Sequence, residues 1–396
     1  MRMPIRARAM RLQTRHDSDG EVALAGQRPD GGGHGAGGAA PLEALYRAVV
    51  QPVATRETPD AWYREWRVMR LDGTTLDVAD TAANREAFGR PASARGVNAT
   101  GAFPQLRLVG VVETGTHVLC GAALGASATG EVTLAAGVVS TLTPDMLCLA
   151  DRGFVGFDLW QQAATTGAAL LWRVKASVGL PVETRHADGS YRSALRWNSH
   201  SRSADRTSIP VRVIEYTLPG MPDADTRYRI ITTILDPDRA PATELAALYH
   251  ERWEIETTFD EFKTHVRGAQ RVLRSKTPEL VRQEAWGFLL AHFALRALMH
   301  EAALGARPYA RDPDTLSFTH AVRVARRTLP HRTAIPPPGL AQWHQTMLRE
   351  LRAECVRSSR GRVVPRGVNR KMSNYPLRSR QTHPTCYADY DVQIVE

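Results

Sequence analysis

Four polar residues in the second half of the chain recur at spacings that suit one face of a helix. They are Tyr249, Arg252, Glu256 and Lys263. At about 100° per residue in an α-helix, their side chains project within an arc of roughly 60°. The apolar stripe of the same segment is centred on the order of 75° away, so the four lie at the shoulder of a buried face. The pattern predicts a half-buried polar site with one carboxylate and two cations.

Glu256 is the carboxylate on this face. Three other glutamates project toward solvent by the same geometry: Glu251, Glu254 and Glu261. In the simplest alternative, Arg252 and Glu256 form an ordinary i,i+4 ion pair worth a few tenths of a kcal/mol, about 0.3. Lys263 favours a functional site, because only four of the 51 basic residues are lysine. A lysine retained here indicates a need for a compact ammonium that binds phosphate.

Two aspartates follow apolar, strand-like runs. Asp72 precedes Gly73, where the first strand is expected to end, and Asp151 follows the run 146–150. Sites in α/β proteins form at the carboxyl ends of strands. Taken singly, each aspartate is more simply explained as a turn residue. Together with Glu256 they supply three carboxylates for hard cations, such as two Mg²⁺ ions that clamp a phosphodiester.

The elements that must position these residues alternate between strand and helix. The expected strands are 68–72, 106–112, 117–126, 146–150 and 169–174, of which the second and third form an antiparallel hairpin. The expected helices are 42–50, 132–142, 157–164, 241–265 and 278–299, with another helical stretch after 301. Between them, 176–236 changes to short β-type pieces, such as 211–216 and 228–235, and is expected to be an insertion.

Composition and charge narrow the class of protein. The chain has 396 residues, 43% hydrophobic and 23% charged, which suits a globular protein with full-sized cores. A net charge of +10 favours a polyanionic partner such as nucleic acid. The four cysteines lack C-x-x-C spacing, so neither a disulfide framework nor a zinc cage is indicated. No apolar run approaches the ~20 residues of a membrane span, and we expect a cytoplasmic protein.

Arginine is concentrated in two further segments. In the first, five arginines face only Asp188 and Asp205; they are Arg192, Arg196, Arg202, Arg206 and Arg212. We expect these to contact DNA phosphates, and Tyr216 and Tyr228 to be strand core rather than base-stacking residues. In the tail, nine basic residues between 352 and 380, including Arg370 and Lys371, face only Glu354. This tail is expected to bind DNA, with a solvated basic tail as the alternative.

The motif residues resemble a known family. Tyr249-x2-Arg252-x3-Glu256-x6-Lys263 is similar to the Y-R-E-K signature of the insertion-sequence 4 type of bacterial DDE transposase. The segments LDGTTLDVADT, LADRGF and LYHERWEIE resemble that family's three acidic motifs. The resemblance covers roughly residues 66–299, and the tail segment RGVNRKMSNYPLRSR is similar to the basic end of these proteins.

The resemblance implies an α/β fold with an RNase H-like core and a β-rich insertion between the second and third acidic residues. Asp72, Asp151 and Glu256 would be catalytic and would bind two Mg²⁺ ions, or Mn²⁺ in their place. Tyr249 and the two cations of the signature would hold phosphates near the transposon end. The implied function is cut-and-paste DNA transposition by metal-dependent phosphodiester hydrolysis and strand transfer at insertion-sequence ends.

The resemblance also implies partners and a division of the chain. The partners would be double-stranded DNA, as terminal inverted repeats and target, and a second copy of the chain in a homodimeric synaptic complex on the bacterial nucleoid. The expected division is an Arg/Gly-rich disordered start at 1–40, the catalytic domain at 41–175 and 237–300, the insertion at 176–236, and a helical, basic C-terminal region at 301–396.

Two alternative functions remain. Family members generally carry a helical N-terminal region that reads the transposon end, whereas a low-complexity stretch precedes Pro41 here. We therefore expect weak or absent end-specific synapsis, because phosphate contacts give affinity while sequence reading needs base contacts. One alternative is a catalytically or synaptically inactive DNA-binding remnant of a transposase. The other is a structure-specific nuclease on the same fold, which would cut DNA without joining a 3′-hydroxyl to another strand.

Overall fold

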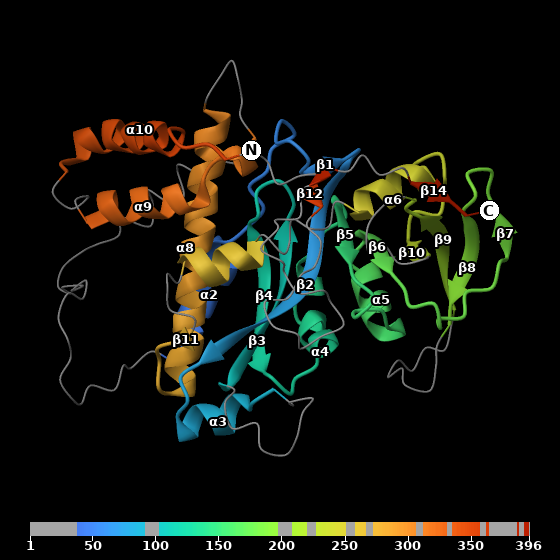
Figure 1. Cartoon of the computed structure of the whole chain (residues 1–396), viewed down its shortest axis with the longest axis horizontal. Helices are drawn as coiled ribbons and strands as arrows, with labels where there is room; N and C mark the ends of the chain where they lie inside the picture. The colour runs from blue at the N-terminus through green and yellow to red at the C-terminus, as the bar shows by residue number, and fades with distance from the viewer. Residues whose placement is uncertain are drawn as a thin grey trace. The chain divides into compact units, whose positions relative to one another are not determined.

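The chain is a mixed α/β protein with one large central sheet and helices on both faces (Figure 1). The computed structural model describes residues 38–91, 103–196, 208–219, 227–250, 258–266, 272–305, 312–330 and 335–356, with the short pieces 362–363, 386–387 and 392–395. None of the helices in these ranges is long and apolar enough to cross a membrane.

The sheet brings together strands from both halves of the chain. Its main path runs through β4 (Leu119–Ala126), β3 (Gln105–Glu113), β2 (Trp66–Val78), β5 (Met146–Ala150), β6 (Ala169–Arg173), β10 (Tyr228–Thr232), β9 (Ile209–Thr217), β8 (Tyr191–Leu195) and β7 (Thr184–Arg185). Along this path β2, β5 and β6 are parallel neighbours, and the other neighbours are antiparallel. The short strands β1 (Trp62–Tyr63), β11 (Val272–Leu273) and β14 (Gln393–Ile394) pair with β2, β2 and β9, and β12 (Arg362–Val363) pairs with β13 (Cys386–Tyr387).

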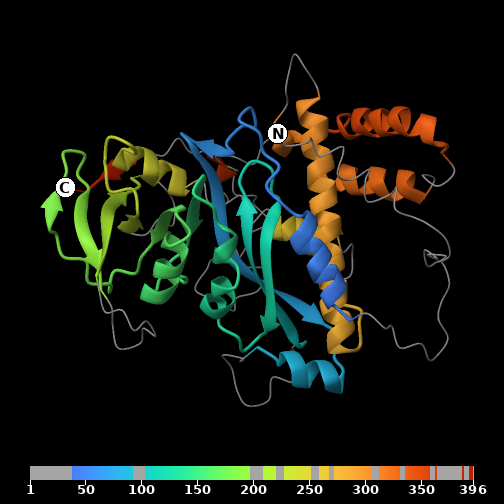
Figure 2. The same ribbon diagram turned by 180° about the vertical axis from the view of Figure 1, so that it is seen from behind.

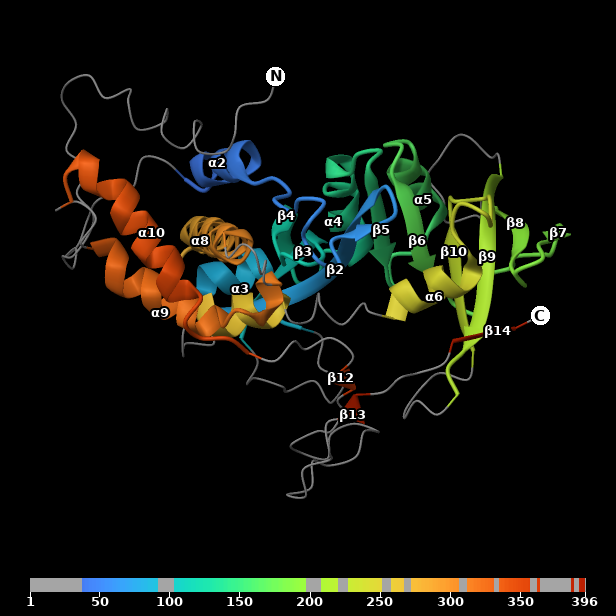
Figure 3. The same ribbon diagram turned by 90° about the horizontal axis from the view of Figure 1, so that it is seen from above.

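Helices cover the two faces of the sheet separately, and Figure 3 shows α4 and α5 on one side and α6 on the other. Because successive side chains of a strand point to opposite faces, Met69 of β2 packs with Trp160 of α5, whereas Leu76 packs with Trp286 of α8. These four helices are α4 (Glu131–Ala136), α5 (Phe157–Ala164), α6 (Ala242–His250) and α8 (Pro278–Leu304). Figure 2 shows α2 (Ala40–Val49) lying along α8, where the rings of Tyr46 and Trp286 are 5.1 Å apart.

The remaining helices are shorter or lie beyond α8. They are α3 (Ala82–Phe88), η1 (Val139–Thr141), the π-helical turn η3 (Glu261–Val266), η4 (Pro313–Thr315), α9 (Phe318–Thr328), η6 (Pro337–Gly339) and α10 (Leu340–Leu351). Apolar side chains of α9 and α10, such as Val324 and Leu348, form a separate buried cluster with Met299 near the end of α8. The helical part of the C-terminal region is therefore built on α8.

Most predicted elements are present, and one helix and one strand differ. The helix predicted at 132–142 is divided into α4 and the 3-10 turn η1. The hairpin is confirmed as β3 and β4, and the helices predicted at 157–164 and 278–299 are confirmed as α5 and α8. The prediction that the first strand ends at Gly73 was wrong, because β2 continues to Val78 through its ladder with β3. Asp72 thus lies inside a long strand rather than after its end.

The β-type segment 176–236 extends the central sheet. Its strand β10 pairs antiparallel with β6, and β9, β8 and β7 follow outward. Tyr216 and Tyr228 are confirmed as strand core: they are 0% and 8% exposed and stack with ring centroids 5.2 Å apart. The predicted disorder of residues 1–40 falls almost wholly outside the described residues, and α2 begins at Ala40.

Candidate catalytic site

The two aspartates singled out from the sequence lie side by side. Leu71 of β2 pairs in parallel register with Ala150, the last residue of β5. Asp72 and Asp151 are the next residues along the chain. Because neighbouring strands are about 4.8 Å apart, the Cα atoms of the two aspartates are separated by roughly 5 Å. Both side chains are half-buried.

Both carboxylates lie on the face of the sheet that α6 covers. Val68 of β2 and Leu149 of β5 pack with Tyr249 of α6 in one buried cluster. Every second side chain along a strand points to the same face of the sheet. Asp72, four residues after Val68, therefore lies on this face. Asp151, two residues after Leu149 and just past the end of β5, lies on it as well.

Local backbone contacts orient the two carboxylates. Asp72 Oδ1 accepts a hydrogen bond from the N–H of Gly73 at 2.7 Å, and Asp151 Oδ1 accepts one from the N–H of Gly153 at 2.7 Å. A Cβ added at Gly153 would lie 2.9 Å from Asp151 Oδ1, which is too close without movement. The glycine two residues after Asp151 is therefore needed for this orientation of the carboxylate.

The end of α6 lies directly against the end of β5. Tyr249 is 2% exposed, and its hydroxyl donates to the carbonyl of Ala150 at 3.4 Å, one residue before Asp151. His250 is buried with its ring 5.0 Å from that of Tyr228, because the strands of segment 176–236 extend the sheet beneath α6.

Arg212 holds the other end of α6 and is not a surface arginine. It was grouped in sequence with the DNA-contacting arginines, but it is fully buried in an ion pair with Asp188. Its Nε donates to Ser190 Oγ at 2.7 Å, and its Nη1 donates to the carbonyl of Ala240 at 2.6 Å. Asp188 also accepts the N–H of Ala242, the first residue of α6, at 2.9 Å. Arg212 and Asp188 therefore fasten α6 to the sheet.

The signature residues continue past α6, and only some of them lie in the described ranges. Arg252 and Glu256 lie outside the described residues. On the far side of them, Phe259 and Phe262 are buried against α8, as the predicted apolar stripe requires, and Lys263 is half-buried in η3. The described pieces before and after Glu256 thus pack against the same face of the sheet that carries Asp72.

The prediction for Glu261 was wrong, because this side chain is buried rather than exposed to solvent. Glu261 begins the π-helical turn η3, where the advance of 100° per residue assumed for an α-helix no longer holds. Arg296 of α8 donates to both of its carboxylate oxygens, with Nε at 2.9 Å from Oε2. Burial raises the pKa of Glu261, but the charge of Arg296 and the hydrogen bonds of His117 and His292 together outweigh burial and hold this pKa well below its ordinary value.

Only some of the DNA-contacting residues expected in the two arginine-rich segments lie in the described ranges. Arg192, on β8, and Arg196, directly after it, are both exposed. Arg202, Arg370 and Lys371 lie outside the described residues. The exposed pair is the part of this expectation that the structure places at the surface.

Arg173 was missed in the sequence. It ends β6 one residue after Trp172, which pairs in parallel register with Ala150. Arg173 therefore lies next to Asp151 across the strands and extends the row of two aspartates with a cation. Its guanidinium carbon lies 4.6 Å from the ring centre of Tyr228. The available signal was its place at the carboxyl end of a predicted strand, the same signal that identified Asp151.

Comparison with known proteins identifies the family. A family model described as the transposase DDE domain matches residues 67–294, more than half of the chain. The chain belongs to the DDE transposase family. The insertion-sequence 4 type is confirmed by similarity to transposase InsG for insertion sequence element IS4 of Escherichia coli strain K12. The two are 26% identical over 330 residues, covering 82% of this chain and 72% of InsG.

A solved transposase is also similar in structure. The piggyBac transposase, seen in a synaptic complex with hairpin DNA, superposes with a TM-score of 0.40 at 10% identity, covering 72% of this chain and 57% of that one.

Two of the three predicted metal ligands of this DDE transposase, Asp72 and Asp151, lie in the described ranges. Within the described ranges, no three His, Cys, Asp or Glu side chains gather as a metal-binding group. Asp72 and Asp151 supply two carboxylates on one face, and carboxylate oxygens are the ligands that Mg²⁺ prefers. The residues present fit a hard divalent cation, with a third carboxylate still required.

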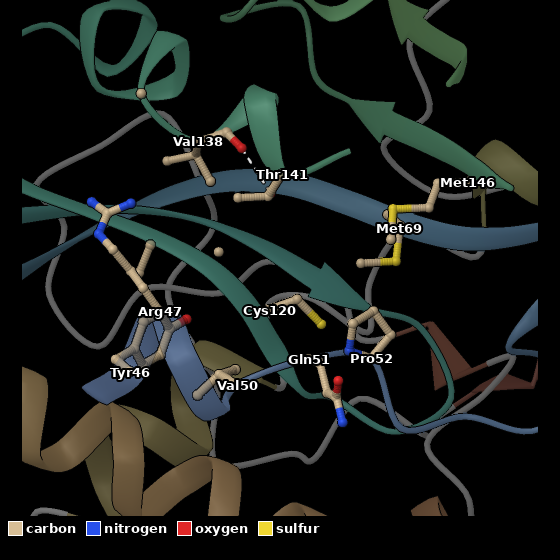
Figure 4. Close-up of a pocket in the computed structure, with 13 residues that line it drawn as sticks. Tyr46, Arg47, Val50, Gln51, Pro52, Met69, Cys120, Val138, Thr141 and Met146 are labelled. Carbon is tan, nitrogen blue, oxygen red and sulfur yellow. Dashed lines mark hydrogen bonds between the residues drawn. The ribbon is translucent and has the colours of Figure 1, made fainter. Parts of the chain in front are cut away.

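A cavity in the transposase lies away from the aspartates. Its volume is about 240 Å³, and Tyr46, Met69, Cys120 and Met146 are among its lining residues (Figure 4). Met146 is the first residue of β5, whereas Asp151 follows the last. The cavity and the carboxylates therefore lie at opposite ends of the same strand.

Proposed function

We propose that this chain cleaves DNA at insertion-sequence ends and transfers the freed strand to target DNA, in a metal-dependent reaction. The observation that carries the proposal is the parallel register of Leu71 with Ala150, which sets Asp72 beside Asp151. Membership of the DDE transposase family supports it. An intact pair of aspartates favours an active enzyme over a DNA-binding remnant.

We assign the catalytic core to the RNase H-like class. In its first part, β2 lies between an antiparallel pair, β3 and β4, on one side and the parallel strands β5 and β6 on the other. That order supports the assignment. We assign the strands β7 to β10 to the β-rich insertion expected between the second and third acidic residues.

Asp72, Asp151 and Glu256 are proposed to hold two Mg²⁺ ions, or Mn²⁺ in their place. At a Cα separation of roughly 5 Å, the two aspartates would be close enough to hold the same cation. When bound, two such ions activate a water or a 3′-hydroxyl and stabilise the leaving oxygen of an in-line displacement. Glu256 follows α6, whose last turn lies against Ala150 on the carboxylate face.

The cations near this row are proposed to bind phosphates of the DNA. Arg173 offers a planar fork beside Asp151, and Lys263 offers a point charge on η3; Arg252 is assigned the same role from the signature. Tyr249 is too buried to present its ring to DNA. Its proposed role is to position the end of α6 through the contact of its hydroxyl with Ala150. Arg192 and Arg196 are proposed to contact the backbone of flanking DNA, as are Arg202, Arg370 and Lys371.

The proposed partners follow from the reaction. InsG is a transposase for an insertion sequence element, and we extend that substrate class to this chain. The DNA would be the terminal inverted repeats and the target, bound by two copies of the chain so that both ends are cut together. The proposed location is the bacterial cytoplasm, at the nucleoid.

The test is a product analysis on labelled duplexes that carry the repeats flanking the gene. The natural chain and Glu256→Gln are each incubated with Mg²⁺ or Ca²⁺. We expect cleaved ends and strand-transfer products with Mg²⁺ only, and neither product from Glu256→Gln. Cleavage without any joined product would identify a nuclease instead. Salt-dependent DNA binding without cleavage by either protein would favour the inactive remnant.

A further inference from the structure

Four separate parts of the chain contribute charged side chains to one buried cluster. Glu261 comes from η3, Arg296 from α8, His117 from the turn between β3 and β4, and Asp314 from η4. The exposures of Glu261, Arg296 and His117 are 7%, 2% and 2%. We call these four residues the Glu261 cluster. It joins the helical C-terminal region to the segment that carries the transposase signature.

Arg296 is the centre of the Glu261 cluster. It donates to both carboxylate oxygens of Glu261, and its Nη2 lies 2.5 Å from Nδ1 of His117. Its Nη1 lies 3.8 Å from Oδ1 of Asp314, and Nε2 of His117 lies 3.3 Å from the same oxygen. A bidentate arginine–carboxylate contact fixes the orientation of the carboxylate as well as its distance.

The backbone at two residues of the Glu261 cluster departs from regular geometry. His117 has φ +57°, a left-handed conformation that is uncommon for a residue with a Cβ and persists only where its surroundings enforce it. Glu261 begins a π-helical turn, and such turns concentrate at functional sites. Both departures from regular backbone geometry bring a side chain to Arg296.

The place of Glu261 in the sequence links the Glu261 cluster to two of the signature residues. Glu261 lies five residues after Glu256 and two before Lys263. Rotation of η3 about its axis would turn Glu261 and Lys263 together, because both lie on it. A carboxylate clamped by Arg296 prevents that rotation, because the buried guanidinium would lose its partner.

We propose that Glu261, held by Arg296, is a positioning residue that anchors η3, which carries Lys263 and begins five residues after Glu256 in the chain. The inference rests on the proposed role of Glu256 as a metal ligand. Groups that orient metal ligands typically change metal affinity or activity by about 10-fold to 100-fold when they are altered. Glu261 is therefore expected to act on metal binding without touching the metal.

The experiment measures binding of Mn²⁺ alone to the full chain, from the paramagnetic resonance signal of free Mn²⁺, for the natural protein, Glu261→Gln and Arg296→Lys. We expect both variants to bind Mn²⁺ about ten-fold more weakly or worse. The midpoint of Mg²⁺ dependence for cleavage should rise in parallel. Glu261→Asp, which keeps the charge, should recover part of the loss and serves if Glu261→Gln does not fold.

Glu215→Gln is the matched control. Glu215 is 5% exposed and pairs with Arg227 and Arg229, but it lies on β9 with its side chain on the opposite face from α6. Its loss should lower stability and leave Mn²⁺ affinity unchanged. Natural Mn²⁺ affinity in Glu261→Asp and Arg296→Lys, whatever their stability, would overturn the proposal and leave Glu261 a purely structural residue.

A fourth protein separates this inference from the proposed function. In the Glu256→Gln background, Glu261→Gln should cause no further loss of Mn²⁺ affinity, because its effect passes through Glu256. A second loss of similar size would overturn the positioning role. If Glu256→Gln alone binds Mn²⁺ as the natural chain does, the proposed ligand set is wrong, and the inference falls with it.

Discussion

Two groups of acidic residues in this protein have the same chemistry and opposite surroundings. Asp72 and Asp151 are half-buried, accept backbone N–H groups, and lie beside one another at the end of β5. Glu261 is buried and closed off by the guanidinium of Arg296. A carboxylate can serve as a metal ligand only where its oxygens remain reachable, so the surroundings decide the role. The two aspartates suit chemistry, and Glu261 suits the orientation of a neighbouring segment.

The largest expected effect is on the reaction itself. Asp72→Asn and Asp151→Asn should each lower Mg²⁺-dependent cleavage by about a thousand-fold or more, because loss of a metal ligand removes several kcal/mol of transition-state stabilisation, roughly 4. Asparagine has the size of aspartate and can still accept a backbone hydrogen bond, so thermal unfolding should change by only a few degrees. Single-turnover cleavage and a melting curve test both statements. More than a tenth of natural activity in either variant would contradict the account.

Glu261 should show the opposite balance between stability and chemistry. Glu261→Gln leaves the buried charge of Arg296 without its carboxylate, and breaking a buried pair in this way costs about 3–5 kcal/mol. Urea unfolding gives this free energy directly. Asp260→Asn, at the exposed neighbouring position, should cost less than about 0.5 kcal/mol. A loss below about 1 kcal/mol for Glu261→Gln would remove the contrast between the two regions.

The pH dependence of stability tests the charges of the Glu261 cluster. Burial lowers the pKa of His117 and so does Arg296, but Asp314 and Glu261 raise it, to about 9 overall. A raised folded-state pKa contributes stability that is complete below about pH 6.5 and is lost as pH rises through about 9. The free energy of unfolding should therefore fall by at most about 3 kcal/mol across this window.

His117→Asn, which has no titrating ring, is the control for this pH dependence. Its unfolding free energy should not change between pH 6.5 and 9 beyond what other groups contribute. A natural chain that is equally flat would show that His117 is neutral and that its Nδ1 accepts an N–H of Arg296.

The smallest expected effect comes from the backbone beside Asp151. In Gly153→Ala the new methyl group would lie 2.9 Å from Asp151 Oδ1 and would displace the carboxylate. A displacement of about 1 Å in a catalytic group can cost on the order of 100-fold, so cleavage should fall by about 10-fold to 100-fold. Gly156→Ala is the matched control, because nothing lies within 4 Å of a Cβ added there. Equal activities of the two variants would show that the carboxylate tolerates movement.

Local sequence patterns predicted the elements and the reachable acids well. Runs of apolar residues located β5 and α5, and the position after an apolar run identified Asp151. The same reasoning placed the end of a strand at Gly73, and it failed because pairing with β3 carries β2 onward to Val78. A local turn signal cannot report a partner strand more than thirty residues away along the chain.

The errors in the candidate site share a cause. Glu261 was placed in solvent on a regular helical wheel, and Arg212 was grouped with surface arginines. Each is buried because a distant residue provides the opposite charge, Arg296 for the first. Arg173 was missed because its place beside Asp151 depends on the register of β5 with β6. The Y-R-E-K assignment of Arg252 and Glu256 stays a prediction, since both lie outside the described residues.

The central claim is that Asp72 and Asp151 act as one site, and a double-mutant cycle tests it most directly. Mg²⁺-dependent cleavage is measured for the natural chain, Asp72→Asn, Asp151→Asn and the double variant. Residues that act as a unit give strongly non-additive losses of activity. The double variant should therefore cleave DNA no more slowly than the less active of the two single variants. Losses that multiply, or one single variant with nearly natural activity, would show that the two aspartates do not share a site.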